Sequence, residues 1–583
     1  MSRRTTMLGR LAALTAVAAL LAAACGNSTT GQSSGAAGPG QTDGVKANEI
    51  DVGALIAVTG PLGGVYNDFT HGVKAYFNLI NAEGGVNGRI LKMTKVRDDQ
   101  TDPTRSVVQA QSLATQDHVF AVFASSPVFN GGQNLASAKV PTFGTNFNTQ
   151  WDAGPSLFGH DGSYNDPARP GPFLPWLAKQ VGATSAATIA YTVAESADCG
   201  TGEANSFTHF GVNLGLKDVS LAFGATDVTA DINLIKEHHV GFVGTCMDPT
   251  GNTLVYRGLQ AAGLTNVKME WPNGYDQATL KSFADEMQGV YFGLQHVPFE
   301  SIASSPEMQL YAKELDASYP NEALGEESMY GWEMAELFVD GLKRIGPNVT
   351  RKRLIDSLNQ ITDFTANGLL PPIDWTIQHT HAGRYDCTAV VQVQGNKFVP
   401  VFGSPTSPYV CFAPNTTTLD TIAPPNFLSG VTPETLPAAL STTLPPGETT
   451  TTIDETAIKA AITASYVNFF NSAETNLAAR LALLQGGPGV ASNVSSLFAT
   501  NAKVGSYVKV TKIDVLSSDD CSSNGFSGQC AAVTYDLYIA ANPKAPTLPG
   551  SNGYAVLDGG VWKVARQTFC ALASLVKQNC PPS

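Results

Sequence analysis

Polar and small residues follow two apolar runs in the first half of the chain, at positions where a strand would end. Ser125 and Ser126 come after the run 119–123, and Gly144, Thr145 and Asn146 come after the run 140–143. Hydroxyls and backbone N–H groups at the start of a helix suit an anionic group such as a carboxylate. The alternatives are that a serine only caps the next helix and that 144–147 is an ordinary polar turn.

A second group of candidates includes an aromatic residue and several polar ones. Tyr66 follows a glycine-containing loop and is either an aromatic wall of a binding site or a surface aromatic. Asp248, Asn273 and Tyr275 follow apolar runs further along the chain, and Asp276 and Glu195 are weaker candidates near the same ends. Ligands of parallel α/β sheets lie beyond the carboxyl ends of the strands. We therefore expect these side chains at one binding site.

Catalytic and metal-binding patterns are weak. His238 and His239 precede an apolar run and are expected to end a helix, whereas His379 and His381 would place two imidazoles on one strand face without a third ligand. The sequence contains no G-x-S-x-G elbow, no phosphate-binding P-loop and no H-E-x-x-H motif. We expect a protein that is not an enzyme, with no metal and no cofactor.

The elements that would position the candidates alternate between strands and helices from residue 48 to residue 412. Such alternation predicts parallel sheets covered by helices, and a segment of this size would form two lobes. The expected strands are 50–58, 90–98, 119–123, 140–143, 187–192, 219–223, 240–244 and 290–294. The expected helices are 72–82, 103–116, 167–180, 202–214, 252–262, 306–318, 326–345 and 351–359.

The N-terminus has the features of an export signal. Two arginines precede an apolar run over residues 7–24 that ends in three alanines, and Cys25 follows directly. This arrangement resembles a bacterial lipobox, which implies a signal peptide over 1–24 and a lipid on Cys25. The alternative is an ordinary signal peptide with an incidental cysteine. Residues 25–47, which are rich in glycine, serine and threonine, are expected to form a flexible tether.

Charge and cysteine content agree with export. The net charge of −14 and the low charged fraction of 14% exclude a nucleic-acid partner, which needs clustered lysine and arginine. The other eight cysteines divide evenly between two regions, as expected for disulfides in an oxidising compartment. We predict the pairs Cys199–Cys246, Cys387–Cys411, Cys521–Cys530 and Cys570–Cys580. For the last four cysteines, a cross pairing that clamps the tail to the sheet stays open.

The composition changes after residue 412. Residues 413–454 are rich in threonine and proline and predict a linker with little apolar surface to bury. A second unit follows over 455–583, with a helix at 455–470 and alternating runs at 507–515, 529–539, 554–557 and 561–567. A helix first and strands afterwards predict an α+β domain.

Several segments of the long unit together resemble the periplasmic binding protein type I family, close to its branched-chain amino-acid and amide branch. They are TGPLG at 59–63, INAEGGVNGR at 80–89, DDQTDP at 98–103, the run 259–264, PNG at 272–274 and the run 392–399. The resemblance implies two doubly wound lobes that close over a small solute. It also implies that Ser125 and Thr145 contact a ligand carboxylate.

The second half of the site departs from that family. Asn273 stands where amino-acid binders place a carboxylate for the ligand ammonium, and Asp248 stands where an aromatic residue is frequent. Cys199-Gly200 replaces the usual Tyr-Gly pair. A buried ammonium needs a negative partner. We therefore expect a ligand with an anionic or hydrogen-bonding group at Ser125, Ser126 and Thr145, and with a neutral polar group at its other end.

The last unit carries FF at 469–470, ALLQ at 482–485, GGVWKV at 559–564 and FC at 569–570. It resembles the mycobacterial low-molecular-weight secreted antigen family, whose cone-shaped α+β fold is related to nuclear transport factor two. No function follows from that resemblance, because the fold serves many functions.

Together these features predict a lipid-anchored solute-binding protein at the extracytoplasmic face of the cell membrane. The expected partners are a small polar solute, amino-acid-like or amide-like, and the permease of an ABC importer in the cytoplasmic membrane. The alternative is a sensory or cell-envelope interaction protein in which the last domain is the binding module.

Overall fold

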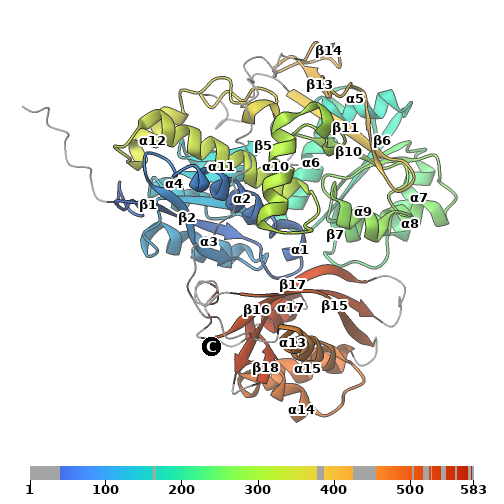
Figure 1. Ribbon diagram of the computed structural model, residues 1–583. Helices are drawn as coiled ribbons and strands as arrows, with labels where there is room; N and C mark the ends of the chain where they lie inside the picture. The colour runs from blue at the N-terminus through green and yellow to red at the C-terminus, as the bar shows by residue number, and fades with distance from the viewer. Residues whose placement is uncertain are drawn as a thin grey trace, which may run out of the picture. The chain divides into compact units, whose positions relative to one another are not determined.

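The computed structural model describes residues 40–161, 166–376, 386–424, 455–501, 505–516, 521, 524, 526, 528–539, 546–558, 561–575 and 580. The predicted signal peptide, Cys25, the histidines at 379 and 381, and most of the predicted linker lie outside these residues. Figure 1 labels the elements of the structure.

Lobe 1 is built on a parallel sheet in the order β2-β1-β3-β4-β5. Its strands are β1 (Glu49–Ile56), β2 (Ile90–Asp98), β3 (Ala121–Ser125), β4 (Thr142–Asn146) and β5 (Leu157–Asp161). Its helices include α1 (Gly63–Tyr66), α2 (Phe69–Ala82), α3 (Pro103–Thr115), α4 (Gly132–Ser137) and the 3-10 turn η1 (Thr149–Ala153). Every residue of β3 and β4 is buried, as expected for strands covered on both faces.

Local sequence signals set the helix starts of lobe 1. The Asp102 carboxylate accepts a hydrogen bond of 2.7 Å from the Arg105 backbone N–H, and Pro103 occupies the first helical position of α3. This is the predicted N-cap and proline arrangement. After α2 the chain turns through Gly84, Gly85 and Gly88, all of which have positive φ, into β2.

Lobe 2 is built on a mixed sheet in the order β14-β13-β11-β10-β9-β8-β6-β7. The parallel strands are β6 (Ser185–Tyr191), β7 (Asn213–Leu221), β8 (Phe242–Cys246), β9 (Lys268–Glu270) and β10 (Tyr291–Leu294). The antiparallel strands are β11 (Asp386–Val393), β12 (Phe398–Val401), β13 (Tyr409–Phe412) and β14 (Thr421–Ile422). The helices are α5 (Phe173–Gln180), α6 (Ala194–His209), α7 (Thr229–Glu237), α8 (Pro249–Ala261) and α9 (Gln277–Phe283).

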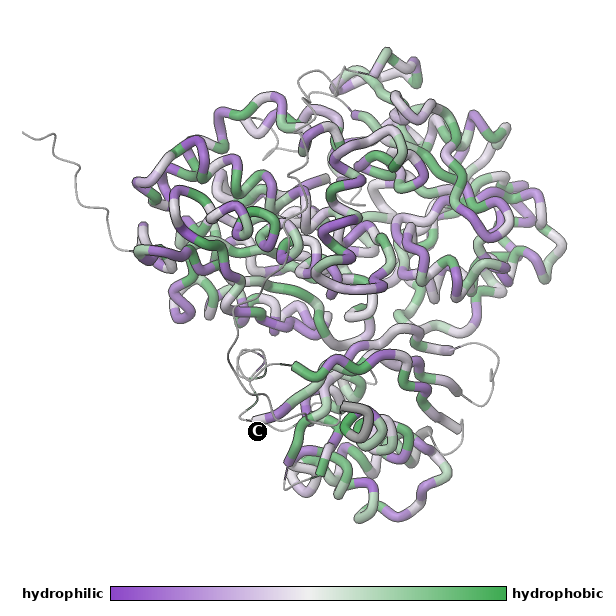
Figure 2. The backbone as a smooth tube through the Cα atoms, in the orientation of Figure 1, coloured by the Kyte–Doolittle hydropathy of each residue, from purple (hydrophilic) through white to green (hydrophobic). Residues whose placement is uncertain are grey.

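After β10 the chain passes through η2 (Phe299–Ser304) to three helices, α10 (Pro306–Ser318), α11 (Glu326–Ile345) and α12 (Arg351–Leu358). Helices α10 and α11 pack against α2 of lobe 1 (Figure 1). Phe338 of α11 joins the aromatic core formed by Phe77, Phe123 and Phe143. The chain then passes η3 (Ala366–Gly368) before it enters the sheet of lobe 2 again at β11. Figure 2 shows hydrophobic and hydrophilic stretches alternating along the helices, as amphipathic packing on a sheet requires.

The last domain has a helical half and an antiparallel sheet in the order β15-β16-β17-β18. The helices are α13 (Glu455–Phe470), α14 (Leu477–Ala482), α15 (Ala491–Asn501) and α17 (Arg566–Leu575), with the turn η5 (Gly487–Val490). The strands are β15 (Ser506–Val515), β16 (Cys530–Ile539), β17 (Leu548–Asp558) and β18 (Val561–Val564). Its core includes Tyr466, Phe469, Tyr535 and Trp562. The α+β prediction for this unit is confirmed.

Four disulfides are present: Cys199–Cys246, Cys387–Cys411, Cys521–Cys530 and Cys570–Cys580. These are the pairs expected from the sequence. Cys387 and Cys411 lie directly opposite each other on β11 and β13.

The fold class is the predicted one, but several predicted boundaries need correction. Strands β3 and β4 continue to Ser125 and Asn146, so the polar residues expected in loops are the last strand residues. Helix α6 spans Ala194–His209 rather than 202–214, and residues 213–221 form β7. The predicted elements did not include β5, β9 and α9, which are short, and gave no bounds for α7. Strand β14 pairs with β13 inside the segment predicted as linker.

Candidate functional site

Ser125 and Thr145 lie side by side at the carboxyl ends of two neighbouring strands. The parallel pairing of β3 with β4 brings the Ser125 Oγ to 3.3 Å from the Thr145 Oγ1. Both side chains are fully buried, and Asn146 beside them is 2% exposed. The sequence analysis correctly expected these groups at one edge of the sheet.

The group that Ser125 binds is a side chain of the protein itself. The Ser125 hydroxyl donates a hydrogen bond of 2.6 Å to the Glu327 Oε2, which comes from the first turn of α11. Burial raises the pKa of the Glu327 carboxyl well above its usual range. Glu327 was not among the predicted site residues. Acidic residues are common in the first turn of a helix, because the positive end of the helix dipole stabilises them there.

Glu326, the preceding residue, is equally enclosed. Its Oε1 accepts a hydrogen bond of 3.1 Å from the Tyr330 hydroxyl one turn further along α11. Burial, together with the negative charge of Asp276, raises the pKa of the Glu326 carboxyl to about 8. Two half-buried carboxyl groups therefore lie next to each other in the chain where the helix begins.

Ser126 and Gly144 have structural contacts of their own. The Ser126 Oγ accepts from the Val128 backbone N–H at 3.3 Å, and its hydroxyl also hydrogen-bonds the buried Asp99 carboxyl. A Cβ added at Gly144 would lie 1.7 Å from the Ala124 carbonyl oxygen. Gly144 thus permits β4 to approach β3 closely, and nothing in its contacts points to a ligand.

Tyr66 is buried, not a surface aromatic, and lies among acidic groups of both lobes. Its ring makes an edge-to-face contact with Phe147 at 5.3 Å between centroids, and it is 5% exposed. Burial raises the pKa of the Tyr66 hydroxyl well above its usual range, and the charges of Glu327, Asp248 and Glu326 add to this.

In lobe 2, Asp248 is the N-cap of α8. Its carboxylate accepts from the backbone N–H groups of Thr250 and Gly251 at 3.1 and 3.4 Å, and from the Tyr191 hydroxyl at 2.5 Å. Asn273 donates from its Nδ2 to the Met247 carbonyl at 3.3 Å, and within the described residues its Oδ1 has no hydrogen-bond partner.

Tyr275 lies away from the other candidates, in the core of lobe 2. Its hydroxyl donates to the Glu300 Oε2 at 2.6 Å and accepts from the Phe299 backbone N–H at 2.7 Å. Asp276 caps α9 by accepting from the Thr279 N–H at 2.6 Å. Glu195, at the start of α6, accepts a hydrogen bond of 3.3 Å from the Asn130 Nδ2, which joins the two lobes directly.

Among the residues that the structure describes, two clusters contain enough ligand atoms for a metal ion. One consists of Cys199, Cys246 and Glu203, but both cysteines are in a disulfide. In the other, the His71 Nδ1 lies 2.8 Å from the Glu322 Oε2 and 3.6 Å from the Asp68 Oδ1, and its ring stacks on Tyr319. That is an imidazole between two carboxylates. His238 ends α7, as predicted.

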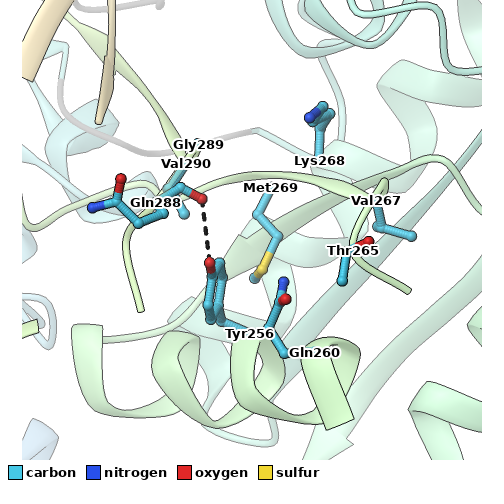
Figure 3. A pocket seen from close by; sticks show the side chains of 9 residues that line it. All are labelled: Tyr256, Gln260, Thr265, Val267, Lys268, Met269, Gln288, Gly289 and Val290. Atoms are coloured by element: carbon cyan, nitrogen blue, oxygen red, sulfur yellow. Dashed lines mark hydrogen bonds between the residues drawn. The ribbon is translucent and has the colours of Figure 1, made fainter. Parts of the chain in front are cut away.

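A small hollow of about 130 Å³ lies in lobe 2, at the end of the sheet opposite to the carboxyl ends of its parallel strands (Figure 3). It is bordered by the amino ends of β9 and β10 and by Tyr256 of α8, whose hydroxyl donates to the Gln288 carbonyl at 3.4 Å. Ligand sites are usually larger, about 300 Å³ or more, and lie at the carboxyl ends of parallel strands. This hollow is therefore not the expected ligand site.

Within the described residues, no helix has the length and apolarity needed to cross a membrane.

The comparisons with known proteins define the class. The sequence model of the family described as periplasmic binding protein matches residues 49–397, more than half of the chain. The chain belongs to this family. A second model, described as the low molecular weight antigen MTB12 C-terminal domain, matches residues 455–580. Both resemblances stated from the sequence are confirmed.

Among curated proteins, a Leu/Ile/Val-binding protein homolog from Brucella abortus (strain 2308) is 30% identical over 92 residues. That segment is 16% of this chain and 22% of the relative, so the chain spans about a fifth of the length of the curated relatives it matches. A homolog from Brucella suis biovar 1 is 29% identical over the same length.

Solved structures of low sequence identity share the fold. A substrate-binding periplasmic protein from Ralstonia solanacearum is 17% identical, with a TM-score of 0.51 and coverage of 62% of this chain and 100% of that chain. A solute-binding protein from R. palustris in complex with benzoate is 18% identical, with a TM-score of 0.52 and coverage of 62% and 98%. A branched-chain amino acid transporter substrate-binding protein from Streptococcus pneumoniae in complex with isoleucine is 15% identical, with a TM-score of 0.50 and coverage of 61% and 100%.

Proposed function

We propose that this chain is a lipid-anchored solute-binding protein that captures a small polar ligand, amino-acid-like or amide-like, at the outer face of the cytoplasmic membrane. It delivers the ligand to the permease of an ABC importer. The lipid is attached at Cys25, and the segment after it tethers the lobes near the membrane. In this role the chain is a receptor and catalyses no reaction.

The observation that carries the proposal is the presence of polar groups at the carboxyl ends of strands in both lobes, which the Asn130–Glu195 hydrogen bond of 3.3 Å joins. Ser125 and Thr145 come from lobe 1, and Asp248 and Asn273 come from lobe 2. The charges of Asp248, Glu326 and Glu327 all act on Tyr66. Binding in such a place lets a solute join the two lobes, which is how this kind of protein signals occupancy to a permease.

The relatives support the class of ligand without fixing its identity. One solved relative holds isoleucine and another holds benzoate, both small molecules with a carboxylate. Asn273 and Asp248 differ from the residues expected in amino-acid binders. The ligand proposed here is therefore a small polar solute that is recognised by a different set of charges.

A thermal melt of the full chain, purified in detergent, tests the proposal. A solute that binds only the folded lobes raises the melting temperature, with about 2.7 kcal/mol of stabilisation at a concentration 100 times Kd. We expect at least one member of a panel of amino acids, amides and amines to raise the melting temperature of the lobes. The unfolding of the last domain, to which the proposal assigns no solute, serves as the internal reference for the melting temperature of the lobes.

A further inference from the structure

The hydroxyl that would hold a ligand carboxylate already holds one from the protein. Ser125 has a single O–H proton, and that proton is donated to the Glu327 Oε2 at 2.6 Å. Thr145, 3.3 Å away from Ser125, completes the same polar corner. A second carboxylate from a ligand would find the Ser125 donor already occupied and would lie beside the Glu327 carboxyl group, which repels an anion whenever it is ionised.

Glu326 extends the acidic character of this corner. It is adjacent to Glu327 in the chain, and its Oε1 accepts from the Tyr330 hydroxyl at 3.1 Å. Across the part of the chain that the structure describes, no ion pair joins Glu326 or Glu327 to a lysine or arginine. A carboxylate that is partly withdrawn from water and has no cation beside it is disfavoured in its charged form.

A third acid on the same helix points to a missing partner independently. Glu326, Tyr330 and Glu333 are spaced so that they share one face of α11. Glu333 is completely buried, and within the described residues neither of its carboxylate oxygens has a hydrogen-bond partner. The nearest ionisable contact is the His160 Nε2, at 3.7 Å from the Glu333 Oε2. One buried acid, Glu333, and two half-buried acids, Glu326 and Glu327, thus lie on this helix without an ion pair to a lysine or arginine among the described residues.

We propose that the site between the lobes takes an organic cation, a primary amine or a guanidinium, with Glu326 and Glu327 as its counter-charges. This inference rests on the proposed function and names the class of its ligand. Tyr66 is buried and its pKa responds to the charges of Glu327 and Glu326, so its ring is the aromatic candidate for further stabilising a cation. Ser125 and Tyr330 act as positioning residues that fix the two carboxylates by hydrogen bonds.

Isothermal titration of the full chain with agmatine and putrescine tests the inference, with leucine, benzoate and benzamide as the comparison solutes. We expect an amine to bind at least ten times more tightly than benzamide, and benzoate not to bind. Glu327→Gln keeps the size of the side chain and an acceptor for Ser125 but removes the charge. It should weaken amine binding about 10- to 100-fold. Glu83→Gln, an exposed carboxyl at the end of α2, is the matched control and should bind as the wild type does.

A variant that removes the Glu327 carboxyl group altogether should gain affinity for solutes that carry a carboxylate. Glu327→Ala removes the internal carboxylate and frees Ser125 and Thr145, so benzoate or leucine should bind this variant at least ten times more tightly than the wild type. Glu326→Gln, which leaves the Ser125–Glu327 hydrogen bond in place, should weaken amine binding without any gain for benzoate. Circular dichroism and the melting temperature establish that each variant is folded, and Glu326→Gln replaces Glu327→Gln if the latter does not fold.

Tighter wild-type binding of leucine or benzoate than of either amine would overturn the inference. Amine binding that is unchanged in both glutamine variants would overturn it as well, since the acids would then be protonated structural groups. A co-purified solute without a positive charge would reject the cation while leaving the proposed function intact. Failure of the proposed function looks different, because no solute of any charge would then bind.

Discussion

The Ser125 hydroxyl donates a hydrogen bond of 2.6 Å to the Glu327 carboxylate, although 202 positions separate the two residues in the sequence. Ser125 ends a strand of lobe 1, whereas Glu327 begins the helix that follows the return of the chain from lobe 2. The contact therefore joins the carboxyl end of β3, where the sequence predicted a site for an anionic group, to the first turn of α11. It places a carboxyl group of the protein itself, with a pKa raised well above its usual range, at that end of the sheet.

Glu326→Gln should stabilise the lobes at neutral and alkaline pH. Burial raises the pKa of the folded-state Glu326 carboxyl to about 8, above its ordinary value of 4.5. The unfolded chain therefore loses this proton first, and the folded state becomes less stable as the pH rises from about 4.5 to about 8. The glutamine variant avoids this loss. Its free energy of unfolding at pH 8 should therefore exceed that of the wild type by about 1 to 3 kcal/mol.

The check on Glu326 is a melt of both proteins across this pH range. The two should agree near pH 4.5 and separate progressively above it. The groups acting on Glu326 are Asp276, Glu327, Glu333, Glu270 and the hydroxyls of Tyr330 and Tyr66. A difference in melting temperature that is constant with pH would show that the Glu326 proton is not its cause.

Gly144→Ala should disrupt lobe 1. The added Cβ would lie 1.7 Å from the Ala124 carbonyl oxygen and 2.9 Å from the Trp151 ring, both in the packed sheet. We expect a loss of about 3 kcal/mol or more, or no folded protein. Gly171→Ala is the control, because a Cβ there meets nothing within 4 Å. Equal melting temperatures for the two variants would contradict the packing described for β3 and β4.

The fold follows from the sequence because its signals are local. The Asp102-Pro103 helix start and the positive-φ glycines after α2 behave as predicted. The site could be predicted only in part. Hydrophobic runs locate the ends of strands, and those ends indicate Ser125 and Thr145. Glu327 reaches the same place through a tertiary contact, and no spacing in the sequence encodes that contact. Tyr275 shows the opposite error, since it follows a strand but turns into the core toward Glu300.

The Cys387–Cys411 disulfide should contribute measurably to the stability of lobe 2. It links β11 to β13 and closes a loop with a sequence separation of 24. Replacing both cysteines by serine should lower the free energy of unfolding by about 3 kcal/mol, as loop closure of this length predicts. Peptide mapping under non-reducing conditions should recover all four pairs, and a cross-linked pair between the two cysteine regions would contradict the structure.

Cys25→Ser should release the chain from the membrane. In the proposed function the lipid at Cys25 is the group that holds the chain at the bilayer. In detergent phase partition the wild type should enter the detergent phase and the variant the aqueous phase. Ser28→Ala, three residues further along, is the control and should behave as the wild type does. Continued partition of Cys25→Ser into detergent would contradict lipid anchoring.

Native mass spectrometry of the full chain, purified gently from its own envelope, tests the central claim most directly. Solute-binding proteins retain their ligand when two lobes enclose it. The account predicts a population whose mass exceeds that of the lipidated chain by one small organic molecule, which is released on unfolding and can be identified. A chain that carries only its polypeptide and lipid mass, and whose melting temperature no solute of the panel raises, would contradict the account.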